Sequence, residues 1–263
     1  MKKNIFYMSS VIFFLIPVLL LILKSITAPW RSGNLPDWTL RGWETVFQDS
    51  RVIESMAITL GIALAVALIN LIVGIPVAKA LSHRSFKLKN TLEVLLLLPL
   101  FLPVIAAAMG LHITMIRLGL ANTWIGVTIV HLVPTIPYTI KVLKAGYDRI
   151  PQDMLNQGRM LKAGVWHAFR TIELPLLIPS IRSAIFLAVT ISAGQYVLTA
   201  IIGGGSVITM PIIYYPFLQS ADDTVMSAFS VAFVLIPAAA VLIAEAAAMA
   251  LAGRLFIKRR SIQ

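Results

Sequence analysis

Few side chains of this sequence have types and spacings suited to catalysis. No cysteine is present, and the four histidines lie far apart in the sequence: His83, His112, His131 and His167. No segment has the spacing of a metal site or an activated nucleophile. The glycines of "GRMLKAG", residues 158–164, lack the Gly-x-x-x-x-Gly-Lys-Ser/Thr spacing of a phosphate-binding loop. We therefore predict a protein that is not an enzyme, needs no cofactor or metal, and does not itself hydrolyse ATP.

A second group of candidates consists of polar side chains inside long apolar runs. Asn70 lies within residues 55–78, which carry no charge, and Gln195 and Tyr196 follow Gly194 in the uncharged run 183–221. Polar groups are costly at membrane depth, so they mark pathways for solutes or ions by default. Hydrogen bonding between helices is the alternative explanation. We predict that Asn70, Gln195 and Tyr196 line a translocation path.

Long apolar runs must position these side chains. Hydrophobic residues make up 59% of the chain and charged residues 13%, against about 45–50% and about 25% in soluble domains. A helix needs about 20 apolar residues to cross a bilayer. We predict an all-α membrane protein with one transmembrane domain, 1–263, whose core spans fill 55–256. The six expected helices are 5–25, 55–81, 92–116, 124–142, 176–200 and 224–256.

The net charge of +11 is unevenly distributed. Most Lys and Arg residues fall at the N-terminus, in the turn 82–90, in the segment 143–174 and in the C-terminal "KRR". Because Lys and Arg accumulate in short cytoplasmic loops, we place both termini and these connections in the cytoplasm, and residues 28–52 outside. The charge thus reports topology and contact with anionic lipid, and indicates no nucleic-acid partner.

The longest of the cytoplasmic connections, 144–175, is amphipathic. Pro151 suits the first position of a helix, and Met154, Leu155, Gly158 and Leu161 follow at spacings that share one face. "KAG", residues 162–164, should end that helix. A second short helix is expected to carry Trp166 and Phe169 and to end at Pro175. Such a segment suits either a hairpin on the inner leaflet or docking to a cytoplasmic protein.

The second half of this segment, "AGVWHAFRTIELPLLIPSI", resembles a known family. It is similar to the permease of binding-protein-dependent ABC importers, whose signature loop runs Glu-Ala-Ala, three residues, Gly, about nine residues, Ile-x-Leu-Pro. The "IELP" of residues 172–175 matches the end of that motif. Counting back from Pro175 places the Glu-Ala-Ala triplet on Asn156-Gln157-Gly158 and the motif glycine on Lys162. The first half of the segment therefore departs from the family motif. "SAGQYVLTAIIGGG", from residue 192, resembles the polyamine, iron and thiamine-like branch.

The resemblance implies a type I ABC importer permease in the bacterial inner membrane. Its implied partners are cytoplasmic ATPase subunits, a second permease in a homodimer or heterodimer, and a periplasmic or lipid-anchored solute-binding protein. The segment 144–175 would be the coupling loop that docks on the ATPase. The implied coupling residues are Met154, Leu155, Asn156, Gln157, Gly158, Leu161, Lys162, Ala163, Gly164, Trp166 and Phe169. The alternative is a stand-alone secondary transporter or channel with an amphipathic loop on the membrane surface.

Overall fold

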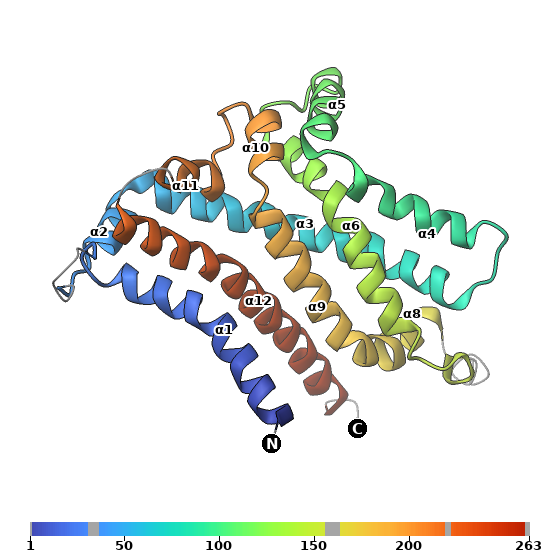
Figure 1. The fold of residues 1–263 in the computed structure, drawn as a ribbon. Coiled ribbons are helices and arrows are strands. Elements are labelled where there is room, and N and C mark those ends of the chain that lie inside the picture. Colours follow the sequence, from blue (N-terminus) through green and yellow to red (C-terminus); the bar gives the residue numbers. More distant parts are fainter. Residues whose placement is uncertain (1, 31–36, 156–163, 219–221, 261–263) are drawn as a thin grey trace. The chain divides into compact units, whose positions relative to one another are not determined.

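A computed structural model describes residues 2–30, 37–155, 164–218 and 222–260, which are almost entirely helical (Figure 1). The chain divides into two compact units, one of residues 1–59 with 208–236 and the other of residues 60–207 with 237–263. Helices α3 (Ser50–His83) and α12 (Asp223–Arg260) each run through both units. The all-helical fold predicted from the sequence is confirmed.

The larger unit is built around α6 (Trp124–Tyr147), which packs along α9 (Leu174–Ala193) (Figure 1). Its other helices are α4 (Lys89–Leu97), η1 (Leu98–Phe101), α5 (Val104–Arg117), α8 (Val165–Ala168), the π-helical turn η2 (Phe169–Glu173) and α10 (Tyr196–Gly203). Small side chains from α3, α9 and α12 form one buried cluster of this unit, with Ala63, Ala67, Ala188 and Ala240 among its members. Small residues allow such helices to approach closely in a membrane.

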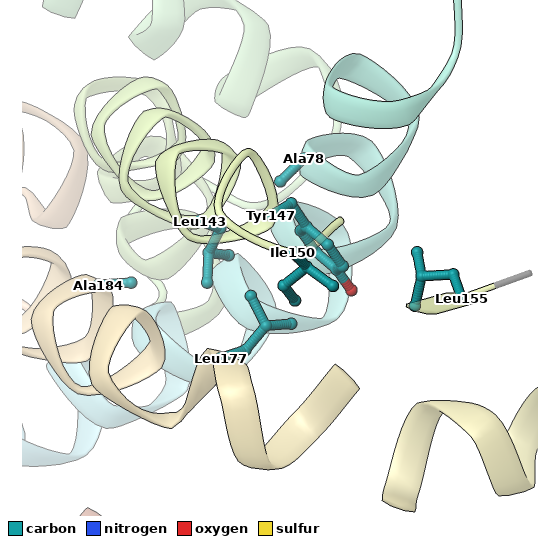
Figure 2. Close-up of a cluster of buried hydrophobic side chains, with 7 residues drawn as sticks. All are labelled: Ala78, Leu143, Tyr147, Ile150, Leu155, Leu177 and Ala184. Carbon is teal, nitrogen blue, oxygen red and sulfur yellow. The ribbon is translucent and has the colours of Figure 1, made fainter. Parts of the chain in front are cut away.

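A second buried cluster lies where α3, α6 and α9 meet the segment 144–175 (Figure 2). Seven side chains, none more than 5% exposed, form it: Ala78, Leu143, Tyr147, Ile150, Leu155, Leu177 and Ala184. Ile150 and Leu155 belong to the first arm of the segment, residues 144–155. Ile172, in the second arm, residues 164–175, packs against the same cluster. Both arms therefore pack against the cluster that α3, α6 and α9 form.

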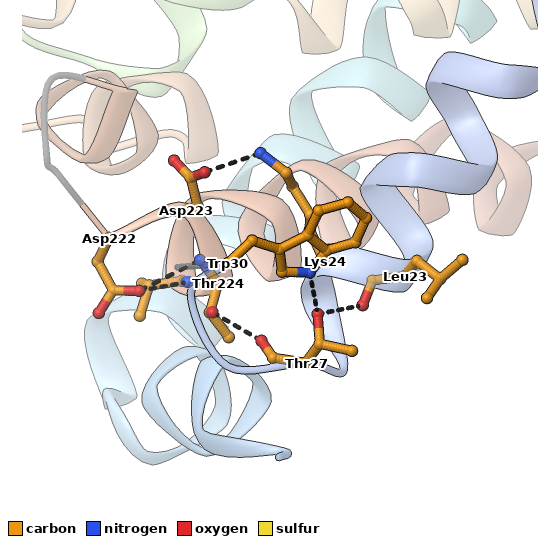
Figure 3. Close-up of polar contacts among 8 residues, drawn as sticks. Leu23, Lys24, Thr27, Trp30, Asp222, Asp223 and Thr224 are labelled. Carbon is orange, nitrogen blue, oxygen red and sulfur yellow. Dashed lines mark hydrogen bonds and ion pairs between the residues drawn. The ribbon is translucent and has the colours of Figure 1, made fainter. Parts of the chain in front are cut away.

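The smaller unit contains α1 (Lys2–Ser25), α2 (Arg41–Gln48), α11 (Met210–Leu218) and the first part of α12. The end of α1 is tied to the start of α12 (Figure 3). Lys24 Nζ lies 2.7 Å from Asp223 Oδ2, and the Thr224 hydroxyl donates to the Thr27 carbonyl oxygen at 2.8 Å. Asp222 accepts hydrogen bonds from the amides of Thr224 and Val225, and so caps α12.

Four helices in the described part of the chain are long and apolar enough to cross a membrane: Ser50–His83, Trp124–Tyr147, Val165–Ala193 and Asp223–Ile243. The pair Lys89–Phe101 and Val104–Arg117 adds a fifth when it is counted as one span, and Val11–Ser25 is a shorter apolar helix. The count of six spans and the side of each terminus stay predictions.

The expectation of one continuous helix over 92–116 is wrong. The two parts of this region meet at an angle of 101°. Leu102 is extended, with ψ of 139°, immediately before Pro103. The proline ring disfavours helical backbone at the preceding residue and removes one N–H donor, so the helix stops and restarts in a new direction.

Candidate functional site

Val165 and Trp166, at the start of α8, form an exposed apolar ridge on the segment 144–175. Val165 and Trp166 are 82% and 70% exposed, and Met154 is 41% exposed. The Trp166 ring stacks on half-buried Phe169, with centroids 5.6 Å apart. The ridge therefore includes a pair of stacked aromatic rings, of which Trp166 is the exposed one.

The implied coupling residues fall into three groups. Met154, Gly164 and Trp166 are exposed, and Phe169 supports Trp166. Leu155, by contrast, is 5% exposed and packs inside the cluster of Figure 2. Six further residues lie outside the part of the chain that the structure describes: Asn156, Gln157, Gly158, Leu161, Lys162 and Ala163.

The prediction that a short helix ends at Pro175 is wrong. Helix α8 passes into η2 and then directly into α9, which extends to Ala193. Pro175 lies just after the π-helical turn η2, where the helical hydrogen-bond pattern is already irregular. The exposed ridge and α9 are therefore continuous helical structure.

A buried ion pair fastens this structure to its neighbours. The Glu173 side chain in η2 is 3% exposed, and its Oε1 lies 2.5 Å from Lys79 Nζ of α3. The Tyr147 hydroxyl of α6 donates to Glu173 Oε2 at 3.1 Å. A buried carboxylate is retained only when its oxygens are satisfied in this way.

A more exposed polar network lies around Asp148, directly after α6. The Ser82 hydroxyl donates to Asp148 Oδ1 at 2.6 Å, and Lys144 Nζ lies 3.1 Å from Oδ2. Burial alone would raise the pKa of Asp148, but the bonds from Ser82 and Lys144 outweigh it and lower that pKa below its usual range. The carboxyl group is therefore ionised at neutral pH.

The predicted path residues Gln195 and Tyr196 lie at a break between two helices. Helix α9 ends at Ala193 and α10 begins at Tyr196, so the expected continuous span over 176–200 is interrupted. Gln195 has extended backbone, with ψ of 92°, and both side chains are partly exposed. Breaks of this kind expose backbone polar groups at membrane depth, where transporters build solute sites.

His131 of α6 joins the two sides of the break. Its Nδ1 lies 2.9 Å from Ser192 Oγ of α9, and its Nε2 lies 3.0 Å from Thr199 Oγ1 of α10. The Thr199 hydroxyl already donates its proton to the Gln195 carbonyl oxygen at 2.6 Å. Nε2–H must therefore donate to Thr199, and Nδ1 accepts from Ser192. The ring is 1% exposed, so this neutral tautomer fits its surroundings.

Sequence reasoning did not identify the hydrogen-bond partners of His131. The available signal was one histidine in an apolar helix, with Ser192 and Thr199 on another predicted helix. Nothing in the spacing shows that residues 61 and 68 positions apart meet at one ring.

Asn70, the third predicted path residue, lies on α3 and is 1% exposed. Neither its Oδ1 nor its Nδ2 has a hydrogen-bond partner among the described residues. One turn later, a Cβ at Gly74 would lie 3.1 Å from side-chain atoms of Thr139 and Leu143 in α6. The Thr139 hydroxyl is likewise buried and unpaired among the described residues.

Comparison with known proteins gives consistent results. A family model described as "Binding-protein-dependent transport system inner membrane component" matches residues 70–257. The transport system permease protein PhnV of Salmonella typhimurium is 25% identical over 230 residues, which are 86% of each chain. The spermidine/putrescine transport system permease protein PotC of Haemophilus influenzae is 21% identical, over 92% of this chain and 95% of its own.

A solved structure agrees in fold. A chain in the crystal structure of a bacterial ABC transporter involved in the import of the acidic polysaccharide alginate superposes with a TM-score of 0.70. The alignment covers 93% of this chain and 96% of that chain, with 15% sequence identity. At that identity the likeness concerns the fold alone.

Proposed function

Because the chain belongs to the family of binding-protein-dependent transport system inner membrane components, we propose that its segment 144–175 is the contact through which ATP hydrolysis drives transport. The protein is a permease subunit of an ABC importer, and it contributes to the translocation path through the inner membrane. ATP is hydrolysed by a separate subunit. Its other partners are a second permease and a solute-binding protein.

One observation carries the coupling proposal: Trp166 is exposed and stacks on Phe169 in a helix that continues into α9. Large aromatic side chains dominate the energy of protein interfaces when they fill a pocket on the partner. Val165, the neighbour of Trp166 in the sequence, is also exposed and adds apolar surface there. Leu155, which is buried, and Ile172, which is partly buried, attach the segment to the cluster of Figure 2. Because α8 continues through η2 into α9, a force applied at Trp166 reaches α9 along continuous helical structure.

The rest of the predicted docking set belongs to the same proposal. Asn156, Gln157, Gly158, Leu161, Lys162 and Ala163 separate the two arms in the sequence, and we assign them to the docking surface together with Gly164. Asn156 stands where the family motif has a carboxylate. Aromatic and apolar contact therefore supplies more of the docking energy here than charge does.

The path proposal rests on the helix break. Gln195 and Tyr196 offer an amide and a phenol where α9 and α10 separate. Asn70 joins the proposal because an unpaired buried amide is costly at membrane depth. We also assign both compact units to one permease domain, 1–263, since α3 and α12 are each shared between them.

Replacing Trp166 with alanine tests the docking surface. The ring faces away from the buried core, so insertion and folding should be unchanged. Loss of an aromatic anchor typically removes about 2 kcal/mol or more of binding energy, which is roughly 30-fold in affinity. We expect the ATPase to co-purify at least tenfold less with Trp166→Ala when the importer subunits are expressed together.

Trp38→Ala is the matched control. Trp38 is 75% exposed, like Trp166, but lies in the connection predicted outside the membrane. It should leave co-purification of the ATPase within twofold of the unsubstituted chain. Equal effects of the two alanine variants would contradict the docking assignment.

A further inference from the structure

Helix α3 has no direct chain connection to the segment 144–175. The segment follows α6 and leads through η2 into α9, so its movement reaches those two helices along the backbone. Helix α3 ends at His83, some sixty residues earlier in the sequence. Any motion that α3 shares with the segment must pass through contacts between side chains.

The apolar contacts of α3 do not by themselves fix its position against the segment. Within the cluster of Figure 2 the helix supplies the small side chain of Ala78, with Leu71 and Ile75 partly buried around it. Dispersion contacts have no directional preference. A helix held only by them can slide while the total contact changes little. The Ser82–Asp148 hydrogen bond also joins α3 to the segment, but it lies in a more exposed position.

The Lys79–Glu173 pair is directional, and separating its two charges is costly. Lys79 Nζ and Glu173 Oε1 are 2.5 Å apart, and the carboxylate also accepts from Tyr147 of α6. Glu173 is 3% exposed, whereas Lys79 is 30% exposed. Drawing α3 away would leave the buried carboxylate without its counter-charge, which is strongly unfavourable.

The family motif does not require this charge. Glu173 occupies the variable position of the Ile-x-Leu-Pro end of the signature loop. Its partner lies 94 residues away in the sequence and supplies the opposite charge. The pair is therefore a property of this chain rather than of the general motif.

We propose that Lys79 and Glu173 form a positioning pair that makes α3 move together with the segment 144–175 when the ATPase changes state. The pair fixes the register of η2 against α3, and Tyr147 places α6 in the same unit. This inference rests on the proposed docking function of the segment. It adds a third helix to the two that are continuous with the segment.

The test uses the absence of native cysteines. A single spin label is attached at Ile72→Cys on α3 or at Phe186→Cys on α9, both partly exposed positions. The complete importer is assembled with its ATPase, second permease and binding protein, and spectra are recorded without nucleotide and with ATP plus vanadate. In the otherwise unsubstituted chain, both labels should respond to nucleotide.

Glu173→Gln should reduce the nucleotide response of the α3 label at least fivefold and leave the α9 response within twofold. Asp148→Asn is the matched control: it removes one negative charge nearby, and its amide oxygen can still accept from Ser82. It should leave both responses within twofold. An unchanged α3 response in Glu173→Gln would overturn the inference. If neither label responds in the unsubstituted assembly, the docking function itself fails.

A second variant covers the case in which Glu173→Gln does not assemble. Lys79→Met combined with Glu173→Leu leaves no buried charge and preserves side-chain volume, a replacement that folded proteins commonly tolerate. The α3 response should again fall at least fivefold. The reversed pair, Lys79→Glu with Glu173→Lys, should restore at least half of it. A full α3 response in the neutral double variant would overturn the proposal.

Discussion

Replacing Gly146 with leucine is expected to lower the amount of folded protein in the membrane about tenfold or more, because α6 and α9 are packed without space at this position. A Cβ at Gly146 would overlap Ser180 Oγ and would lie 2.8 Å from Ser180 Cβ and 3.1 Å from Leu177 Cδ2. Ser180 Cβ is fixed to the backbone, so the two helices would have to separate. Overpacking typically costs about 1–3 kcal/mol, and a leucine inserts four carbons.

The measurement is the monodisperse fraction of detergent-extracted protein and its thermal midpoint. Gly110→Leu is the matched control, because a Cβ at exposed Gly110 of α5 meets nothing within 4 Å. It should leave the folded fraction within twofold. Equal losses in the two variants would show that the tight crossing of α6 and α9 does not govern folding.

Replacing His131 with leucine is expected to reduce transport at least tenfold while most of the protein still folds. The substitution removes both hydrogen bonds that join the ends of α9 and α10. Bonds between membrane helices contribute about 0.6 kcal/mol each on average, so global stability should fall only modestly. Without the two hydrogen bonds of His131, the break between α9 and α10 would no longer hold Gln195 and Tyr196 in position. Small displacements of groups that position a solute are costly for function.

The test is ATP-dependent uptake by vesicles that contain the whole importer, with solutes supplied as a mixture of anionic and cationic small molecules. His112→Leu is the control, since no hydrogen bond joins His112 Nδ1 to the described residues. His131→Gln, which keeps one donor and one acceptor, should recover part of the activity. Uptake by His131→Leu equal to that of His112→Leu would show that the histidine does not position the break.

Sequence reasoning predicted the helices and the amphipathic segment because both depend on local patterns. Apolar runs of sufficient length mark spans, and Trp166 and Phe169 lie three residues apart, as neighbours on one helical face do. Proline gave an ambiguous signal. Pro103 marks a sharp bend, whereas Pro175 lies in the first turn of a helix that continues. The difference depends on the local backbone, which the residue type alone does not specify.

The side-chain contacts between helices that are distant in the sequence could not be predicted from the sequence. Lys79 of α3 and Glu173 of η2, like His131 of α6 and Thr199 of α10, meet only because helices distant in the sequence pack together. A single sequence contains no periodic pattern that pairs such positions. Two of the features that we assign to function, the Lys79–Glu173 ion pair and the bridged break, depend on that packing.

The most direct test of the coupling proposal is a nucleotide-dependent crosslink from the exposed ridge to the ATPase. Val165 is 82% exposed and the chain has no native cysteine, so Val165→Cys gives a single reactive thiol there. The importer is assembled with its ATPase subunits and treated with a thiol-specific photocrosslinker, with and without ATP plus vanadate. We predict one crosslinked product that contains the ATPase and whose yield changes with nucleotide. A thiol that labels only lipid, in an assembly from which the ATPase still co-purifies, would contradict the account.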